Sequence, residues 1–149
     1  MVSMAAECLF CEIAARRAPA EIFFEDELTL AFLDHRPLFA GHALLVPKLH
    51  CETLADLPED QVQPLFANAR ALSRAVEEAL SSDGSLVAIN NRVSQSVPHL
   101  HIHVVPRRRK DGLRGFFWPR SKYRDPAEAQ AVCRLLHDAM ERLQSAARR

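Results

Sequence analysis

The sequence predicts an α+β domain with a mainly antiparallel five-stranded sheet, one main helix and a C-terminal helix. Three β-type runs precede the first long amphipathic stretch, two more follow it, and a second amphipathic stretch closes the chain. Strands that succeed one another without regular helical crossovers are typical of antiparallel pairing. The length of 149 residues suits one domain with a sizeable core, so we expect a single domain.

The first three strands are expected in the N-terminal third of the chain. Residues 21–25 and 29–34 are short β-type runs on either side of an acidic segment, which is the pattern of a hairpin. A third apolar run begins after Gly41 and ends at Pro47. We expect a short helix ahead of these strands.

Two helices and two further strands are expected in the remainder of the chain. Residues 62–80 carry apolar side chains at helical spacing and predict the main helix, with Pro64 near its start, where a proline costs little. A fourth strand is expected at residues 85–91 and a fifth at residues 99–105. Residues 126–149 predict the C-terminal amphipathic helix.

The fifth predicted strand carries an unusual row of histidines. Three of the seven histidines stand at alternate positions with apolar residues between them: His99, His101 and His103. Residues two apart on an extended strand share a face, so the three imidazoles are expected on one side of the sheet. Pro98 and Pro106 flank the row and are expected to mark the strand's ends. The row fits a metal site, a nucleophile with helper groups, or both; an accidental polar face is the alternative.

The composition is that of an ordinary soluble protein, with 48% hydrophobic and 26% charged residues. The formal net charge is zero, so bulk electrostatics indicates no partner. No apolar run approaches the length of a membrane span, and Glu7 and Glu12 interrupt the stretch where a signal peptide would be apolar. We expect a cytoplasmic protein whose four cysteines are thiols or metal ligands instead of disulfides.

The segment "HLHIHVV" resembles the His-x-His-x-His-x-x signature of the histidine triad (HIT) family of nucleotide hydrolases and transferases. The resemblance covers roughly residues 8–120 and includes "FFEDELTLAFLD", "GHALLVPKLH" and "NNRVSQSVPHLHIHVVPR" in the family's order. It implies one HIT-like domain over residues 1–149, with residues 121–149 as a C-terminal helix. It also implies a purine nucleotide substrate and a homodimer.

The resemblance implies a role for each histidine beside the phosphate. His101 matches the nucleophile that attacks the α-phosphorus of a nucleotide, and imidazole is a good nucleophile near neutral pH. His103 and His42 match helpers at the phosphate, and Ser96 matches the hydroxyl that protonates the leaving group. For His42, an ordinary core histidine is the alternative.

The resemblance also implies nucleotide contacts for three other polar side chains. Asp34 matches the acid that accepts from the ribose hydroxyls, and Asn90 and Gln95 match amides that donate to phosphate oxygens. The alternatives are a turn cap before Pro37 for Asp34 and a turn residue at a strand end for Asn90. The family's loop before Gln95 is usually rich in glycine, whereas residues 90–95 contain none, so fewer positions here are permissive.

The segment "CLFC" places Cys8 and Cys11 in the spacing of half a zinc site. In zinc-bearing relatives, the residues that correspond to His50 and His99 complete the tetrahedron. Such a closed Cys2His2 site implies a structural zinc ion, and we expect no organic cofactor. The alternatives are two buried thiols that pack under the sheet, and Cys51 as a ligand.

A basic, aromatic segment follows the histidines, with Arg107 to Lys110 and then Phe116 to Trp118. The resemblance implies that C-terminal segments line the substrate pocket of a partner subunit. The interpretation that we favour is that the cationic side chains receive an acidic leaving group there. A solvated loop is the second interpretation. Nucleic acid is the partner that we favour least.

The sequence is compatible with three functions. The first is a phosphoramidase or dinucleoside polyphosphate hydrolase that forms a nucleotidyl-histidine intermediate. The second is a non-catalytic nucleotide sensor that uses the same pocket. The third is a nucleic-acid end-processing enzyme similar to aprataxin, against which stands the lack of a C-terminal zinc finger, because Cys133 is the only cysteine after the histidines.

Overall fold

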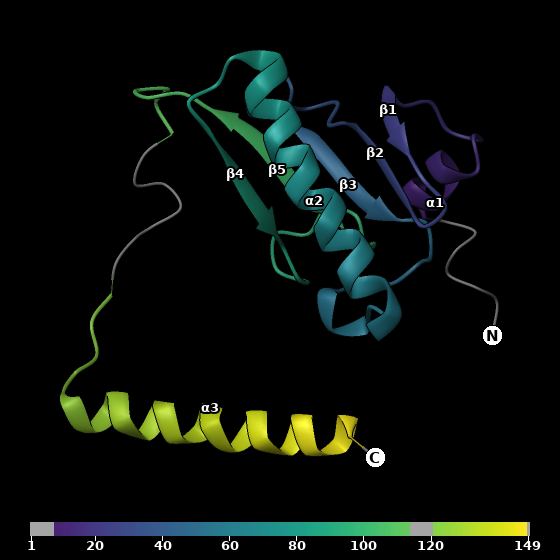
Figure 1. Ribbon diagram of the computed structural model, residues 1–149. Coiled ribbons are helices and arrows are strands. Elements are labelled where there is room, and N and C mark those ends of the chain that lie inside the picture. Colours follow the sequence, from purple (N-terminus) through teal and green to yellow (C-terminus); the bar gives the residue numbers. More distant parts are fainter. Residues whose placement is uncertain (1–7, 114–120, 149) are drawn as a thin grey trace. The chain divides into compact units, whose positions relative to one another are not determined.

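Five antiparallel strands form one open sheet in the order β1-β2-β3-β5-β4 (Figure 1). The structure, a computed structural model, describes residues 8–113 and 121–148. The strands are β1 (Ile22–Glu25), β2 (Thr29–Leu33), β3 (Ala43–Pro47), β4 (Gly84–Ile89) and β5 (Ile102–Arg107). The helices are α1 (Leu9–Ala14), the short 3-10 helix η2 (Leu54–Asp56), α2 (Glu59–Leu80) and α3 (Pro126–Ala147).

The chain divides into two compact units at residues 111 and 112. The first unit contains the sheet, α1 and α2, and the second contains α3. The predicted α+β class, with its five-stranded antiparallel sheet, is confirmed. The single domain over residues 1–149 stays a prediction.

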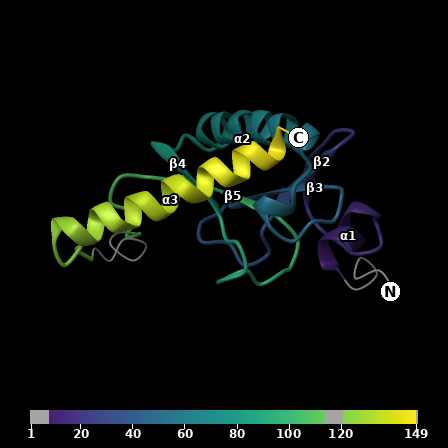
Figure 2. The same cartoon turned by 90° about the horizontal axis from the view of Figure 1, so that it is seen from below.

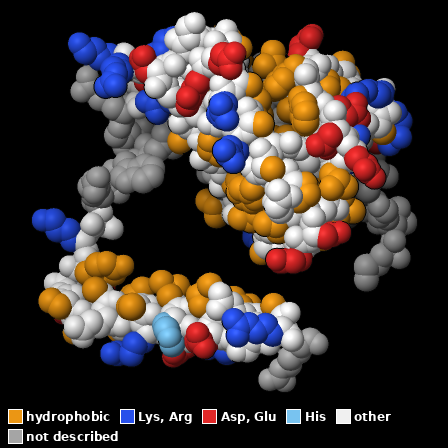
Figure 3. Space-filling model, viewed as in Figure 1, with side chains coloured by type: hydrophobic (Ala, Val, Ile, Leu, Met, Phe, Trp, Pro, Cys, Tyr) orange, Lys and Arg blue, Asp and Glu red, His pale blue; other side chains and the backbone are white. Residues whose placement is uncertain are grey.

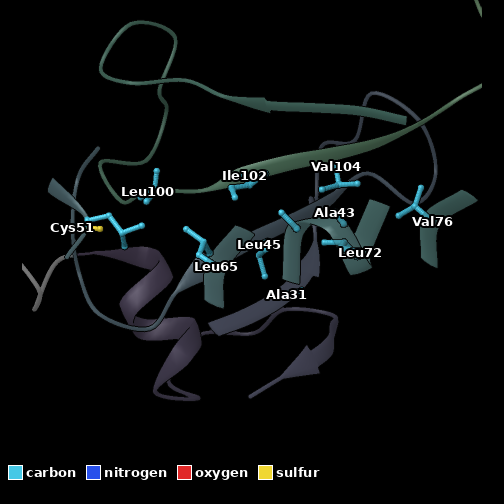
Figure 4. Packing of buried hydrophobic residues seen from close by; sticks show 12 residues of the cluster. Ala31, Ala43, Leu45, Cys51, Leu65, Leu72, Val76, Leu100, Ile102 and Val104 are labelled. Carbon is cyan, nitrogen blue, oxygen red and sulfur yellow. The ribbon is translucent and has the colours of Figure 1, made fainter. Parts of the chain in front are cut away.

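Different helices cover the two faces of the sheet (Figures 1 and 2). The apolar side of α2 packs on one face, which we call the α2 face, against Ala31, Leu45, Ile102 and Val104 (Figure 4). The short helix α1 packs on the other, the α1 face, against Leu30, Phe32, Leu44 and Val46. Burial of both faces explains why the central strands β2 and β3 consist almost wholly of apolar residues.

The strand register decides which side chains reach the α1 face. Leu44 on β3 is paired with His103 on β5, and the next pair is Leu45 with Ile102. Directly paired residues share a face and successive residues alternate between faces. Because Leu44 belongs to the cluster under α1 and Leu45 to the cluster under α2, His103 projects from the α1 face.

Strand β5 begins later than the sequence predicts. We expected it to start at His99, but its pairing with β3 and β4 starts at Ile102. The backbone N–H of Leu100 donates instead to the carbonyl of Cys51, at 2.7 Å. His99 and His101 therefore lie in the segment that leads into the strand, held by contacts outside the sheet ladder.

The expectation that Pro106 ends the strand was wrong. Pro106 lies inside β5, opposite Ser85 on β4. Its missing N–H is tolerated because β3 pairs with β5 no further than Val104, so no ladder bond is lost on that side.

Two of the basic side chains after the histidines are used within the first unit. The Arg107 guanidinium donates to the Asp111 carboxylate at 2.6 Å, and Arg108 donates to the carbonyl of Leu80 at 2.6 Å. The aromatic residues 116–118 lie outside the described residues, so the role of the segment as a whole stays a prediction.

Helix α3 is amphipathic, as predicted. Asp125 caps its start, where its carboxylate accepts from the backbone N–H of Glu128 at 2.8 Å. Hydrophobic side chains gather along one side of the helix (Figure 3). Over the described ranges, no helix is long and apolar enough to cross a membrane.

Candidate active site and metal site

A cavity of about 860 Å³ opens on the α1 face of the sheet. Its walls come from α1, β2, β3, β5, the segments before β1 and after β2, and the segment that leads into β5. It is lined by four of the side chains that the sequence singles out: Asp34, Ser96, His101 and His103. Residues that lie up to 69 positions apart thus meet around one hollow.

Among the described residues, His101 presents one bare ring nitrogen, Nε2. Its Nδ1–H donates to the carbonyl oxygen of His99 at 2.7 Å, and a carbonyl can only accept. In the neutral ring, this bond leaves a lone pair on Nε2. The side chain is buried and lines the cavity. The backbone therefore holds His101 in the tautomer that a nucleophile requires.

A chain of hydrogen bonds sets the protons of His42 and His103. The backbone N–H of Leu38 donates to Nδ1 of His42 at 3.1 Å, so the neutral His42 ring carries its proton on Nε2 and donates to Nδ1 of His103 at 2.9 Å. His103 then carries its proton on Nε2, which is buried and has no partner among the described residues. An unpartnered donor on a cavity wall fits an anionic oxygen such as that of a phosphate.

The same bonds argue against a metal ion among Asp34, His42 and His103, although their ligand atoms lie within 4.8 Å of one another. A metal needs a lone pair on each nitrogen that binds it, and Nε2 of His42 carries a proton. The two ring nitrogens are 2.9 Å apart, whereas on a tetrahedral ion with bonds of about 2.0 Å they would be about 3.3 Å apart. The cluster is a chain of hydrogen bonds. His103 lines the cavity, and His42 acts on the cavity through its bond to His103.

Asp34 makes two kinds of contact. Its Oδ1 accepts from the backbone N–H of Arg36 at 2.9 Å, which matches the alternative of a turn cap before Pro37. Its Oδ2 lies 3.7 Å from Nε2 of His42, and the residue lines the cavity. The turn cap and a position at the cavity are thus compatible, and the contact with a ribose stays a prediction.

Gln95 secures its own loop. Its Oε1 accepts from the backbone N–H of Arg92 at 2.7 Å, and its Nε2 donates to the carbonyl of Glu52 at 2.7 Å. The bonds hold a strained loop, since Arg92 and Ser94 adopt φ angles of 68° and 60° where glycine would be unstrained. Gln95 and Asn90 are not among the residues that line the cavity, and their contacts with phosphate stay predictions.

Cys8, Cys11, His50 and His99 form a second cluster, with ligand atoms within 4.8 Å of one another. Nδ1 of His99 lies 3.3 Å from Sγ of Cys8 and 3.6 Å from Sγ of Cys11. Nδ1 of His50 lies 3.4 Å from Sγ of Cys11 and 3.3 Å from Nδ1 of His99. A tetrahedral zinc ion, with bonds of about 2.0–2.1 Å to nitrogen and 2.3 Å to sulfur, has N–N edges of about 3.4 Å and N–S edges of about 3.6 Å. The donor atoms therefore fit zinc.

The proton positions in this cluster also favour a metal. Nε2–H of His99 donates to the carbonyl of Pro47 at 2.8 Å, which leaves the lone pair of Nδ1 pointing at the thiols. Two thiols that merely pack under the sheet would not account for the two imidazole nitrogens that converge on them. Cys51, the alternative ligand, lies instead in the apolar cluster of the α2 face.

The pKa values of two histidines predict how stability depends on pH. Burial, together with neighbouring imidazoles, lowers the pKa of His99 and of His103 to about 4. In the unfolded chain both rings take a proton near pH 6.5. In metal-free protein we therefore expect full stability above pH 6.5 and a loss between pH 6.5 and 4, of up to about 3 kcal/mol for each ring. Urea unfolding with a chelator at pH 7.5, 6.0 and 4.5 measures this.

A matched variant tests whether protonation of the His103 ring causes part of this loss of stability. His103→Gln keeps a polar side chain but removes one titrating group, so its free energy of unfolding should fall less steeply over the same interval. An equal slope in the variant and the parent protein would contradict the assignment to His103.

Sequence reasoning missed the apolar wall of the cavity. Leu9, Phe10 and Ile13 of α1 line it, as does Val97 next to Ser96. A usable signal was present, because Leu9 and Ile13 are one helical turn apart directly beside the cysteines.

Fold and site together define an α+β domain with a histidine nucleophile candidate in a cavity beside a Cys2His2 cluster. A HIT domain is matched over residues 15–110, and the chain belongs to the HIT family. The chain is 36% identical over 109 residues to an adenylylsulfatase of Arabidopsis thaliana, which covers 72% of this chain and 55% of that protein. It thus spans about half the length of that relative.

Two solved structures are similar along nearly the whole chain. A Streptococcus mutans protein has a TM-score of 0.78 at 34% identity, covering 95% of this chain and 87% of that one. A Zn-bound histidine triad family protein of Mycobacterium smegmatis has a TM-score of 0.69 at 40% identity, covering 95% of this chain and 99% of that one.

Proposed function

We propose that the protein is a nucleotide hydrolase or transferase that cleaves at the α-phosphate of a nucleoside phosphoramidate, a related anhydride or a dinucleoside polyphosphate. Membership of the HIT family supports this, as does similarity to an adenylylsulfatase. The observation that carries the proposal is the bare Nε2 of His101 in a cavity that His103 also lines, with an unpartnered N–H on its ring.

In the first step, the lone pair on Nε2 of His101 attacks the α-phosphorus. A P–N bond forms while the bond from phosphorus to the leaving group breaks, and the leaving group departs with that electron pair. The ring becomes cationic, and its Nδ1–H bond to the His99 carbonyl stabilises this charge. Water then attacks the phosphorus and loses a proton to the solvent, the P–N bond breaks with its electron pair returning to Nε2 of His101, and a nucleoside monophosphate leaves. An acceptor other than water makes the same sequence a transfer.

The neighbouring groups act on the charges that develop. Nε2–H of His103 donates to a phosphoryl oxygen, a contact of the kind that contributes about 10²–10³ in kcat. His42 is a positioning residue, because its bond to Nδ1 fixes that proton on Nε2 of His103. Ser96, exposed at the cavity, supplies the hydroxyl for the leaving group, and Asp34 accepts from the ribose.

We also propose that zinc occupies the Cys2His2 cluster, where it would fix α1 to the segments that carry His50 and His99. The fit of the donor atoms and the Zn-bound relative support this. A closed site of four protein ligands has a structural role, so the chemistry stays at His101. The purine preference, the homodimer and the cytoplasmic location stay predictions.

A substrate panel tests the proposed function. Adenosine 5′-phosphoramidate, adenylyl sulfate and diadenosine tetraphosphate, with their guanosine counterparts, are each incubated with the full chain, and products are separated by chromatography. We expect AMP or GMP from at least one of them. Tight AMP binding without turnover of any member would contradict an enzyme and favour the non-catalytic sensor.

A further inference from the structure

We propose that metal occupancy of the Cys2His2 cluster and nucleotide binding in the cavity are thermodynamically coupled through Phe10. The inference rests on the proposed function, because it takes a nucleotide as the occupant of the cavity. It assigns to Phe10 a positioning role: the ring transmits the state of the metal cluster to the wall against which the nucleotide lies.

Helix α1 cannot hold its place by itself. It spans only Leu9–Ala14, and its N-cap residue, Cys8, makes no side-chain cap bond. A helix of this length is far below what is stable alone in water, so tertiary anchors decide its position. Two of those anchors are the cluster thiols of Cys8 and Cys11, at the start of the helix and within its first turn.

The same turn of α1 forms a wall of the cavity. Leu9 and Phe10, the two residues between the cluster cysteines, both line it. The cluster and the cavity therefore share one stretch of backbone, and whatever fixes or releases the cysteines also fixes or releases this wall.

Phe10 contacts both sites through its ring. It is 5% exposed and stands edge-on to the ring of His99, a cluster residue, with centroids 5.9 Å apart. It also stands edge-on to the ring of His101, with centroids 5.2 Å apart and an interplanar angle of 88°. Phe32 supports it from the sheet at 5.3 Å. Close-packed rings transmit displacement because a core has no room to absorb it.

Coupling of this kind is reciprocal. If zinc organises the wall, zinc raises nucleotide affinity, and the nucleotide must raise zinc affinity by the same factor. Coupling between two sites in a protein is typically about 5- to 150-fold, and we expect at least a fivefold effect here.

The test measures both directions with AMP, which needs no turnover. Calorimetry gives the Kd of AMP for zinc-loaded and zinc-free full-length protein, and competition with a chromophoric chelator gives the Kd of zinc with and without saturating AMP. We expect the same ratio, fivefold or more, from both. Equal AMP affinity with and without zinc would overturn the inference and leave the proposed function intact, whereas no AMP binding to loaded protein would overturn both.

Two variants test the route. Phe10→Leu keeps an apolar side chain but removes the ring edge, and we expect its coupling ratio to approach one while AMP and zinc still bind. Phe66→Leu is the matched control, because this phenylalanine is 40% exposed on α2, and its ratio should stay that of the parent protein. An unchanged coupling ratio in Phe10→Leu would overturn the role of Phe10. The ratio would also stay unchanged if the coupling arose from global unfolding of the zinc-free chain, so that result overturns the role of Phe10 as well.

Discussion

His101→Ala is expected to lower kcat for release of the nucleoside monophosphate by about 10⁴–10⁶, the order of the losses when one member of a catalytic triad is removed. The physical reason is the loss of the only nucleophile that the proposed mechanism uses, since Nε2 of His101 is the bare nitrogen that the backbone orients into the cavity. AMP affinity should change by less than about tenfold, because the other cavity walls remain. Steady-state kinetics and calorimetry measure the two effects.

A histidine elsewhere in the chain provides the control for this variant. His137→Ala removes an exposed imidazole on α3 and should leave kcat unchanged. Circular dichroism melting of both variants separates loss of chemistry from loss of fold. If His101→Ala keeps more than a tenth of the parent's kcat, another residue is the nucleophile.

The second large effect is expected when a cluster cysteine is removed. Cys8→Ser replaces a thiolate ligand with a hydroxyl that zinc binds poorly, so the stabilisation from bound metal is lost. With free zinc about 1,000-fold above its Kd, that stabilisation is about 4 kcal/mol, which lowers Tm by roughly 10 °C for a chain of this size. Differential scanning calorimetry with elemental analysis of the same samples measures both quantities.

Cys133→Ser is the matched control, because Cys133 is exposed on α3 and lies outside the cluster. Its zinc content and Tm should equal those of the parent protein. Burial and the neighbouring Cys8 thiol raise the pKa of Cys11 to about 11, so zinc must displace protons from thiols and should bind more weakly as pH falls. One equivalent of zinc retained by Cys8→Ser at unchanged Tm would contradict the proposed site.

Local patterns were enough to predict most of the fold. The alternation of apolar residues predicted the strands, and the helical spacing predicted α2 and α3, because each pattern reports directly which side of an element is buried. The ends of β5 could not be predicted in this way. They depend on where β3 stops pairing and on a bond from Leu100 to Cys51, and a repeating pattern contains neither fact.

Part of the candidate site could likewise be predicted from the sequence, and part could not. Spacing predicted half of a zinc site at Cys8 and Cys11, and the resemblance to the HIT family added His50 and His99; the structure brings these four residues together. The proton positions could not be predicted, because they depend on single carbonyl and N–H partners such as Pro47 and Leu38, which only the folded backbone supplies. Gln95 illustrates this point, because its amide donates to a carbonyl 43 residues away. The resemblance to the family indicated a role for Gln95 at the phosphate, but it could not indicate this hydrogen-bond partner.

The stereochemical course of the reaction shows whether a histidine such as His101 attacks the phosphorus. An α-phosphorothioate substrate of known configuration is hydrolysed in isotopically labelled water, and the configuration of the product is determined. Each in-line displacement inverts the phosphorus, so a covalent nucleotidyl-histidine followed by water predicts overall retention. Inversion would show that water attacks the substrate in a single step, and it would contradict the account.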